Sequence, residues 1–353
     1  MFPTQRNGRG PGGVIRDGNL GTSSLAHLFI HIPDWSMTPT LLQLAALLAG
    51  KSALEEIGLS LEIASTLEQP CRIHRSLSLL PRPRRITVYG NAAGHAQLLN
   101  ILGVSNELKH VSTDLFLDGI VVDVAAVLTP FLPNLFLSSR PSNLAVQIVY
   151  ALVGLSINVS RLGEWGDAED FLMLRISSLD MGFWDLAPTL PEEVARRLPT
   201  ANITNLSIRR YSSVFRQDFR RLFQMVNAVQ EFRVADSAIN DIVQALASSQ
   251  PAGEECEPIP LPRLHTFRLK DINFASTPHV ATAAHLGHLL GQRYRDGFPL
   301  SKLSMAYCPH ISWDVCSGFT GYLKDHLCWD RYEAAGDRHR VCETCHTRWS
   351  DLD

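Results

Sequence analysis

Apolar residues recur along this chain in a short three-point pattern, L-x-x-L-x-L. The clearest examples begin at Leu264 and, 36 residues later, at Leu300. Side chains of a strand point alternately to its two sides, so the apolar positions share one side and the intervening residues share the other. The pattern therefore predicts short strands that each have one buried and one exposed side.

The same pattern begins at ten positions, and the intervals between them are 24 to 39 residues. They are Leu25, Leu54, Pro83, Leu108, Leu132, Phe171, Ile203, Val229, Leu264 and Leu300. Segments with helical spacing lie between several of them, among them 41–48, 192–198, 238–247 and 281–294. Repeats of about 30 residues that alternate a strand with a helix are typical of leucine-rich repeats. We therefore predict an α/β leucine-rich-repeat solenoid, with a curved parallel sheet on its concave face and helices on its convex face.

The extent of this predicted solenoid follows from where the pattern starts and stops. We expect about ten irregular repeats over residues 25–311, after a disordered leader over residues 1–24 that is rich in Gly, Arg, Asn and Ser. Ser312 is a suitable N-cap and an apolar stripe follows it, so a capping helix is predicted over residues 312–329. Residues 330–353 are expected to form a polar tail that contains cysteine and histidine.

Residues 141–160 carry no charged side chain over 20 positions, which is long enough to consider a membrane span. Asn143, Gln147, Ser156 and Asn158 interrupt the apolar run. The segment also occupies the place where a repeat has its covering helix. We therefore predict a buried helix here and no membrane insertion.

Charge and cysteine content narrow the classes of partner and compartment. The formal net charge is -3 over 353 residues and no long block of one sign occurs, which argues against a nucleic-acid partner. Seven cysteines, an odd number without framework spacing, and no signal peptide indicate a reducing compartment. We expect an intracellular protein, either cytoplasmic or nuclear.

Three blocks near the end of the chain, residues 261–272, 289–300 and 303–311, resemble the C-terminal repeats of F-box leucine-rich-repeat proteins of basidiomycete fungi. In that family an N-terminal F-box recruits a Skp-type adaptor and a cullin ubiquitin ligase, and the repeats hold the substrate. Residues 1–37 lack the sequence motif with which an F-box begins, which is expected if the N-terminus is truncated. The resemblance therefore implies a Skp-type adaptor only if an F-box is present, and it supports substrate recognition more directly than ubiquitin transfer.

Positions predicted to face the concave side are mainly cationic in the last five repeats. The candidates for partner binding are Arg175, Arg209, Arg233, Arg268, Lys270 and Lys302. Neighbouring strands lie about 5 Å apart, so these side chains would bind an acidic or phosphorylated protein segment through charge-assisted hydrogen bonds. The competing interpretation is that these positions are simply solvated, and that Glu231 and the acidic residues of 248–262 neutralise them.

The tail contains Cys342, Cys345 and His346 in a C-x-x-C-H arrangement, the attachment motif of a c-type haem. Haem attachment needs an oxidising compartment, for which the chain has no targeting segment. Zinc is the better alternative for this motif, although a structural zinc site normally has two such pairs and only one is visible. The remaining interpretation is a pair of ordinary cysteines.

Motifs of hydrolases, metalloproteases and P-loop enzymes are absent from the sequence. Residues 8–13 match G-x-G-x-x-G, but no strand pattern precedes them. We therefore expect no enzymatic activity and no cofactor. The predicted function is protein recognition, as the substrate-binding part of an F-box-type ubiquitin ligase receptor. The alternatives are an interaction scaffold without ligase recruitment and, more remotely, a zinc-binding protein that uses its tail.

Overall fold

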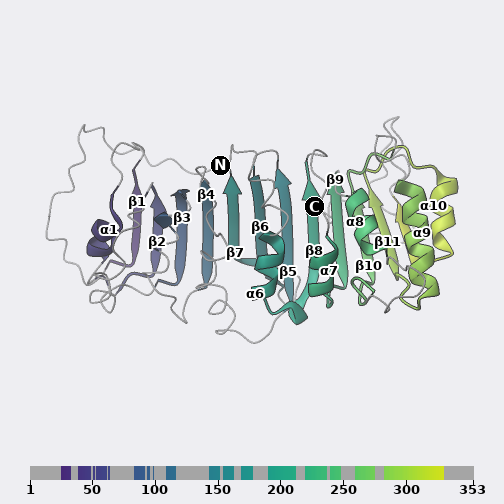
Figure 1. Ribbon diagram of the computed structural model, residues 1–353, viewed down its shortest axis with the longest axis horizontal. Coiled ribbons are helices and arrows are strands. Elements are labelled where there is room, and N and C mark those ends of the chain that lie inside the picture. The colour runs from purple at the N-terminus through teal and green to yellow at the C-terminus, as the bar shows by residue number, and fades with distance from the viewer. Residues whose placement is uncertain are drawn as a thin grey trace.

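A single sheet of twelve strands runs through the computed structural model of the protein (Figure 1). The structure describes residues 25–32, 39–48, 51, 53–61, 63, 83–91, 94–95, 98, 109–116, 143–151, 154–162, 168–177, 190–211, 219–236, 239–247, 259–274 and 282–329. The strands are β1 His27–His31, β2 Glu56–Ser60, β3 Arg85–Asn91, β4 His110–Phe116, β5 Leu144–Ala151, β6 Gly154–Leu162, β7 Ala168–Ser177, β8 Ile203–Arg210, β9 Glu231–Asp236, β10 Thr266–Lys270, β11 Lys302–Ala306 and β12 His326–Trp329. Their order across the sheet is β1-β2-β3-β4-β7-β6-β5-β8-β9-β10-β11-β12.

The helices connect successive strands and cover one face of the sheet (Figure 1). They are α1 Leu41–Leu48, α6 Leu190–Arg197, α7 Arg220–Met225, α8 Ile239–Leu246, α9 Thr282–Arg295 and α10 Trp313–Thr320, with a short 3-10 helix η3 at Thr200–Asn202. The other face of the sheet carries no helix in the described part of the chain. No described helix is long and apolar enough to cross a membrane.

The core lies between the sheet and these helices, because alternate residues of each strand are buried there. Burial alternates strictly along β4 and β10. Four buried phenylalanines join helix to sheet in the C-terminal half: ring centroids are 5.9 Å apart for Phe219 and Phe223, 5.3 Å for Phe223 and Phe232, and 5.5 Å for Phe232 and Phe267. Burial of such large apolar side chains is the main stabilising contribution to a fold of this kind.

The predicted fold class, an α/β leucine-rich-repeat solenoid with a parallel sheet, is wrong, because the sheet is mixed and its strands do not follow sequence order. Strand β6 pairs antiparallel with both β5 and β7. The meander β5–β6–β7 enters the sheet in reverse order, so that β4 pairs with β7 and β5 pairs with β8. All other neighbouring pairs are parallel.

The predicted buried helix over residues 141–160 is also wrong, because this segment forms β5 and most of β6. Burial along β5 alternates with a period of two, which is the period of a strand. Val146, Ile148, Ile157 and Val159 are buried and β-branched, and β-branched residues favour strands over helices. Residues 141–160 lack charged side chains because they form two adjacent strands in the middle of the sheet.

Eight of the ten predicted strand starts lie within a described strand or two residues before one. The other two, Leu108 and Leu132, lie outside the described residues, as do the predicted leader and tail. The predicted capping helix over residues 312–329 is shorter than expected. Ser312 does cap α10, since its Oγ accepts a hydrogen bond from the Val315 amide at 3.4 Å. The chain then turns and adds β12 to the edge of the sheet.

Strands β9, β10 and β11 end in the same way. Asp236, Asp271 and Tyr307 have φ values of 61°, 56° and 52°, in the left-handed region. Lys270 pairs with Ala235 on one side and with Ala306 on the other. Asp236, Asp271 and Tyr307 each come directly after one of these paired residues, so they occupy equivalent positions. A left-handed residue turns the backbone sharply, and aspartate adopts this conformation more readily than most residues. The chain therefore leaves three successive strands by the same turn.

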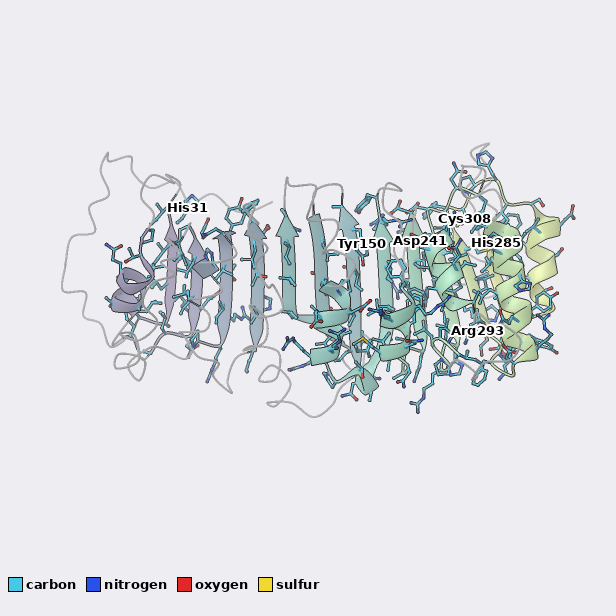
Figure 2. The ribbon with its side chains drawn as sticks, in the orientation of Figure 1. His31, Tyr150, Asp241, His285, Arg293 and Cys308 are labelled. Atoms are coloured by element: carbon cyan, nitrogen blue, oxygen red, sulfur yellow. The ribbon has the colours of Figure 1, made fainter. Side chains whose placement is uncertain are left out.

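Two buried arginines connect helices to other parts of the fold. Arg293 of α9 is 2% exposed and donates hydrogen bonds to the carbonyl oxygens of Pro260 at 2.9 Å and Leu261 at 3.1 Å (Figure 2). Burial lowers the pKa of Arg293 to about 10. Near the end of β8, Arg210 forms a buried ion pair with Asp241 of α8.

Gly90 of β3 is a position where only glycine fits. Its φ is +150°, and a Cβ built there would lie 2.0 Å from the carbonyl oxygen of Leu61. We expect Gly90→Ala to lower the free energy of unfolding by at least about 2 kcal/mol, since an unfavourable backbone conformation alone costs about 1–3 kcal/mol. Urea denaturation followed by circular dichroism measures this change.

Gly318 of α10 provides the matched control for that substitution. It is exposed, and a Cβ built there meets nothing within 4 Å. Gly318→Ala should raise the stability by about 0.5–1 kcal/mol, because alanine favours helices over glycine. Equal effects of the two substitutions would contradict the described conformation of Gly90.

Candidate functional site

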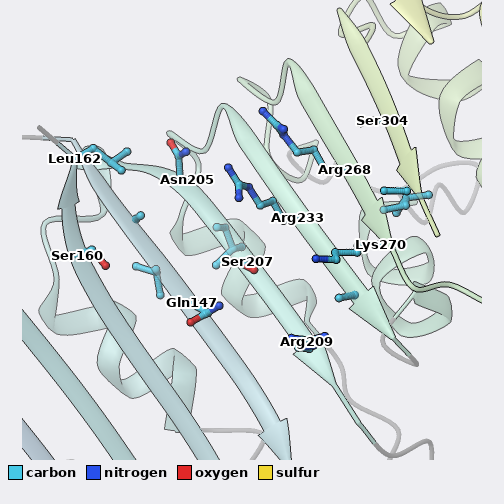
Figure 3. Close-up of a pocket in the computed structure, with 16 residues that line it drawn as sticks. Gln147, Ser160, Leu162, Asn205, Ser207, Arg209, Arg233, Arg268, Lys270 and Ser304 are labelled. Atoms are coloured by element: carbon cyan, nitrogen blue, oxygen red, sulfur yellow. The ribbon is translucent and has the colours of Figure 1, made fainter. Parts of the chain in front are cut away.

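A groove lies on the face of the sheet opposite the described helices, over strands β5, β6 and β8 to β11 (Figure 3). Its volume is about 480 Å³. We call it the strand-face groove and define it by its polar lining residues, which are Gln147, Ser160, Asn205, Ser207, Arg209, Arg233, Arg268, Lys270 and Ser304. Each of them occupies an outward position of its strand, so the alternation that buries the core also builds the groove.

One row of polar side chains crosses the groove at right angles to the strands. Cross-strand pairing places Gln147 beside Ser207, Ser207 beside Arg233, Arg233 beside Arg268 and Arg268 beside Ser304. Neighbouring strands are about 4.8 Å apart, so this row is about 19 Å long. Amide and hydroxyl groups occupy its two ends, and two guanidinium groups occupy its middle.

A single carboxylate serves both of these guanidinium groups. Nε of Arg233 donates a hydrogen bond to Oε1 of Glu231 at 2.7 Å, and Nη2 of Arg268 donates to Oε2 at 3.3 Å. Nε of Arg268 lies 2.9 Å from Oε1 but is not aimed at it as a hydrogen-bond donor, and this buried N–H has no other acceptor. The three side chains together carry one net positive charge.

Arg209 lies at the other end of the groove, beside the two aspartates that end β9 and follow β10. Its Nε donates to Oδ2 of Asp236 at 2.8 Å, and its Nη2 lies 3.7 Å from Oδ2 of Asp271. The hydrogen bond to Asp236 raises the pKa of Arg209 above its usual value, although partial burial opposes this effect. The guanidinium also lies 4.9 Å from the ring centre of Tyr211. Nζ of Lys270 lies 5.9 Å from the ring centre of Tyr307.

Four of the six cationic residues predicted from the sequence line the strand-face groove: Arg209, Arg233, Arg268 and Lys270. The other two, Arg175 and Lys302, do not. Arg175 lies on β7 and faces Asp114 of β4 at 3.5 Å. Burial raises the pKa of Asp114, and the charge of Arg175 offsets part of that rise. Lys302 lies in a different row, between Thr266 and His326.

The competing interpretation from the sequence, neutralisation by acidic residues, agrees with part of this geometry. Glu231 pairs with two of the arginines, while the acidic residues of 248–262 lie outside the described part of the chain. Sequence reasoning missed Asp236 and Asp271, and it assigned Gln147 to a buried helix. The signal for Gln147 was its place between Val146 and Ile148, an alternation that indicates a strand.

Other buried ionisable groups serve packing. Burial lowers the pKa of His95 to about 4, so this side chain is neutral at physiological pH, and its Nδ1 donates to the carbonyl oxygen of Asn91 at 2.9 Å. Burial raises the pKa of the Cys316 thiol to about 12, which makes it a poor nucleophile. Among the described residues, no three His, Cys, Asp or Glu side chains gather closely enough to hold a metal ion. Cys342, Cys345 and His346 lie outside those residues.

No family model matches the chain, and no curated protein matches it. Among solved structures it is similar to one described as morphinone reductase in complex with tetrahydroNAD, with 12% identity over 89% of this chain and 77% of the other and a TM-score of 0.21. The expectation that this chain has no enzymatic activity is not carried further. A TM-score this low carries no argument about a reaction, so none is assigned.

Proposed function

We propose that this protein is a recognition module that binds an acidic or phosphorylated segment of a partner protein in the strand-face groove. The observation that carries the proposal is the row from Gln147 to Ser304, with Arg233 and Arg268 at its centre. Planar guanidinium groups match carboxylates and phosphates in geometry and bind them through paired hydrogen bonds. The groove is open on the face without described helices, where an extended segment can reach it.

The length of the row supports a peptide of defined size. About 19 Å corresponds to about six residues of extended chain, which advances about 3.3 Å per residue. Gln147 and Ser207 offer donors and acceptors for the main chain at one end, whereas Ser304 at the other end is buried and lines the floor of the groove. A segment with an acidic residue near its middle would therefore meet both kinds of groups.

The ion pairs already present do not prevent such binding. The exposed fractions of the Arg233 and Arg268 side chains are 38% and 21%, and that of Glu231 is 20%. Exposed ion pairs contribute only about 0.2–1 kcal/mol; Arg233 is exposed enough to approach that class, whereas Arg268 and Glu231 are half-buried. A ligand anion can therefore share the exposed Arg233 with Glu231, and it competes with Glu231 for Arg268.

The first test replaces both central arginines. Arg233→Gln combined with Arg268→Gln should weaken binding of acidic peptides at least tenfold, because each lost charge-assisted hydrogen bond is worth about 1.5–3 kcal/mol. The probe is a library of eight-residue peptides that carry glutamate or phosphoserine at varied positions, with affinities measured by fluorescence anisotropy. The wild-type protein should select peptides with a central anion, and its affinity should fall as salt rises.

A second double variant controls for net charge. Arg221→Gln with Arg295→Gln removes two exposed arginines of α7 and α9, on the covered side of the sheet, and should leave peptide binding unchanged. Thermal unfolding of both variants checks that they remain folded. Selection of uncharged peptides by the wild-type protein, or equal weakening by the two double variants, would contradict the proposed site.

The setting we propose is a ubiquitin ligase receptor inside the cell, cytoplasmic or nuclear, in which the bound partner is a substrate. The resemblance to the fungal F-box family supports this part of the proposal. Among the described residues, Cys308, Cys316 and Cys328 form no disulfide bond, and unbonded cysteines are usual in a reducing compartment. Copurification of a Skp-type adaptor with the tagged protein from fungal cells tests it. Recovery of a partner without an adaptor would instead favour a scaffold without ligase recruitment.

A further inference from the structure

Glu231 occupies the place between Arg233 and Arg268 where the anion of a ligand would bind. It starts β9, and Arg233 lies two residues later on the same side of the strand. Arg268 reaches the same carboxylate from β10, and Figure 3 shows the two arginines side by side with their side chains extended in the same direction. Any ligand anion at the centre of the groove therefore competes with a carboxylate that belongs to the protein.

Carboxylates accompany the other arginine of the groove in the same manner. Asp236 and Asp271 both lie within 4 Å of Arg209. The four cationic side chains of the groove and these three carboxylates leave one net positive charge. The groove is thus not a strongly positive surface, and its attraction for a singly charged ligand is small.

The consequence depends on the charge of the ligand. A carboxylate that displaces Glu231 exchanges one negative charge for another, and Glu231 has the advantage of being held in place by the chain. A phosphomonoester carries about -1.5 to -2 charges near pH 7 and three strong acceptor oxygens. It brings more charge than the group it displaces, and in the place of Glu231 it offers a further acceptor oxygen near the Arg268 Nε–H, which makes no hydrogen bond in the structure.

We propose that Glu231 is an internal competitor that makes the strand-face groove select a phosphomonoester over a carboxylate. The preferred ligand is a phosphorylated segment of a partner protein, and its acidic but unphosphorylated counterpart binds more weakly. Glu231 is in this sense a specificity-determining residue, and the inference rests on the proposed function of the groove. A merely structural pairing of Glu231 with the arginines would affect stability and would leave this selectivity unchanged.

The test compares three eight-residue peptides that are identical except for phosphoserine, glutamate or serine at one central position. Their affinities for the wild-type protein and for Glu231→Gln are measured by fluorescence anisotropy at constant ionic strength. The wild-type protein should bind the phosphoserine peptide at least tenfold more tightly than the glutamate peptide. For the Glu231→Gln variant, the glutamate peptide should gain the most affinity. The ratio of the affinities for the phosphoserine and glutamate peptides should then fall to about threefold or less.

Two further variants separate competition from general charge and from folding. Asp114→Asn removes a carboxylate that also faces an arginine on the same side of the sheet, but outside the groove, and should leave the ratio as in the wild type. Glu231→Asp keeps the charge and shortens its reach toward Arg268, so its ratio should be intermediate. This variant also tests the inference if Glu231→Gln does not fold.

The possible failures are distinguishable. Equal affinity of the wild-type protein for the phosphoserine and glutamate peptides, or a ratio unchanged by Glu231→Gln, would overturn the role of Glu231 while the groove remains a peptide site. No binding of any of the peptides to either protein would overturn the proposed function itself. Inorganic phosphate serves as a competitor: displacement of the peptide at equal concentration would mean that the groove binds the free anion and not a protein segment.

Discussion

Leu303→Asp should unfold the C-terminal part of the protein. Leu303 is fully buried on β11, where it pairs with Phe267 of β10 and Leu327 of β12. A carboxylate at this position would lose its hydration without gaining a partner, and burial of an unpaired polar or charged group costs several kcal/mol. The total stability of a folded domain is only about 5–15 kcal/mol. Loss of circular dichroism and rapid proteolysis of the C-terminal strands are the expected observations.

The neighbouring residue provides a control on the same strand. Lys302 is partly exposed on the groove side of β11, so Lys302→Asp introduces the same side chain without burying it. We expect its free energy of unfolding to lie within about 0.5 kcal/mol of the wild type, as for most surface substitutions. A Leu303→Asp protein as stable as Lys302→Asp would mean that the described register of β11 is wrong.

Asp241→Ala should produce the second large loss of stability. The side chains of Arg210 and Asp241 are 7% and 10% exposed, so their ion pair is almost completely removed from water. Loss of the carboxylate removes a counter-charge from the buried guanidinium of Arg210. Breaking a buried pair in this way costs about 3–5 kcal/mol. Urea denaturation gives the difference in free energy of unfolding directly.

An apolar double replacement tests the physical cause. Arg210→Met with Asp241→Leu removes both charges while filling a similar volume, and apolar replacements of buried pairs are often neutral or stabilising. We therefore expect the double variant to be more stable than Asp241→Ala by at least about 2 kcal/mol. A double variant as unstable as the single one would show that packing of the aspartate, and not its charge, is the main contribution.

The positions of nine of the twelve described strands could be predicted from the sequence, but those of β5, β6 and β12, and the order of the strands in the sheet, could not. Each of the predicted strands can be recognised from its local sequence, because apolar residues such as Phe267 and Leu269 alternate with polar neighbours over five positions. The pairing of β4 with β7 joins Val111 to Leu172, far apart in the sequence, and no local pattern encodes it. The reversed strand β6 was missed because a long uncharged stretch was assigned to a helix, although its β-branched residues favoured strands.

The same limit applies to the candidate site. Arg233 and Arg268 were predictable, because alternation alone decides that they face away from the core. That Glu231 lies between them depends on the register of β9 against β10, which is a property of the folded sheet. The contribution of Gln147 depends on the reversed order of β5 to β7, which brings β5 next to β8.

The meander of β5, β6 and β7 also has a consequence for how the chain acquires its fold. Its antiparallel pairs join residues close in sequence, with Ala151 opposite Gly154 and Leu162 opposite Ala168. Parallel pairs require much longer loops to close, as for Thr266 and Lys302. Short loops close at lower entropic cost and form faster. The central meander is therefore the natural nucleus of folding, and the two parallel flanks can grow outward from its opposite edges, one toward each end of the chain.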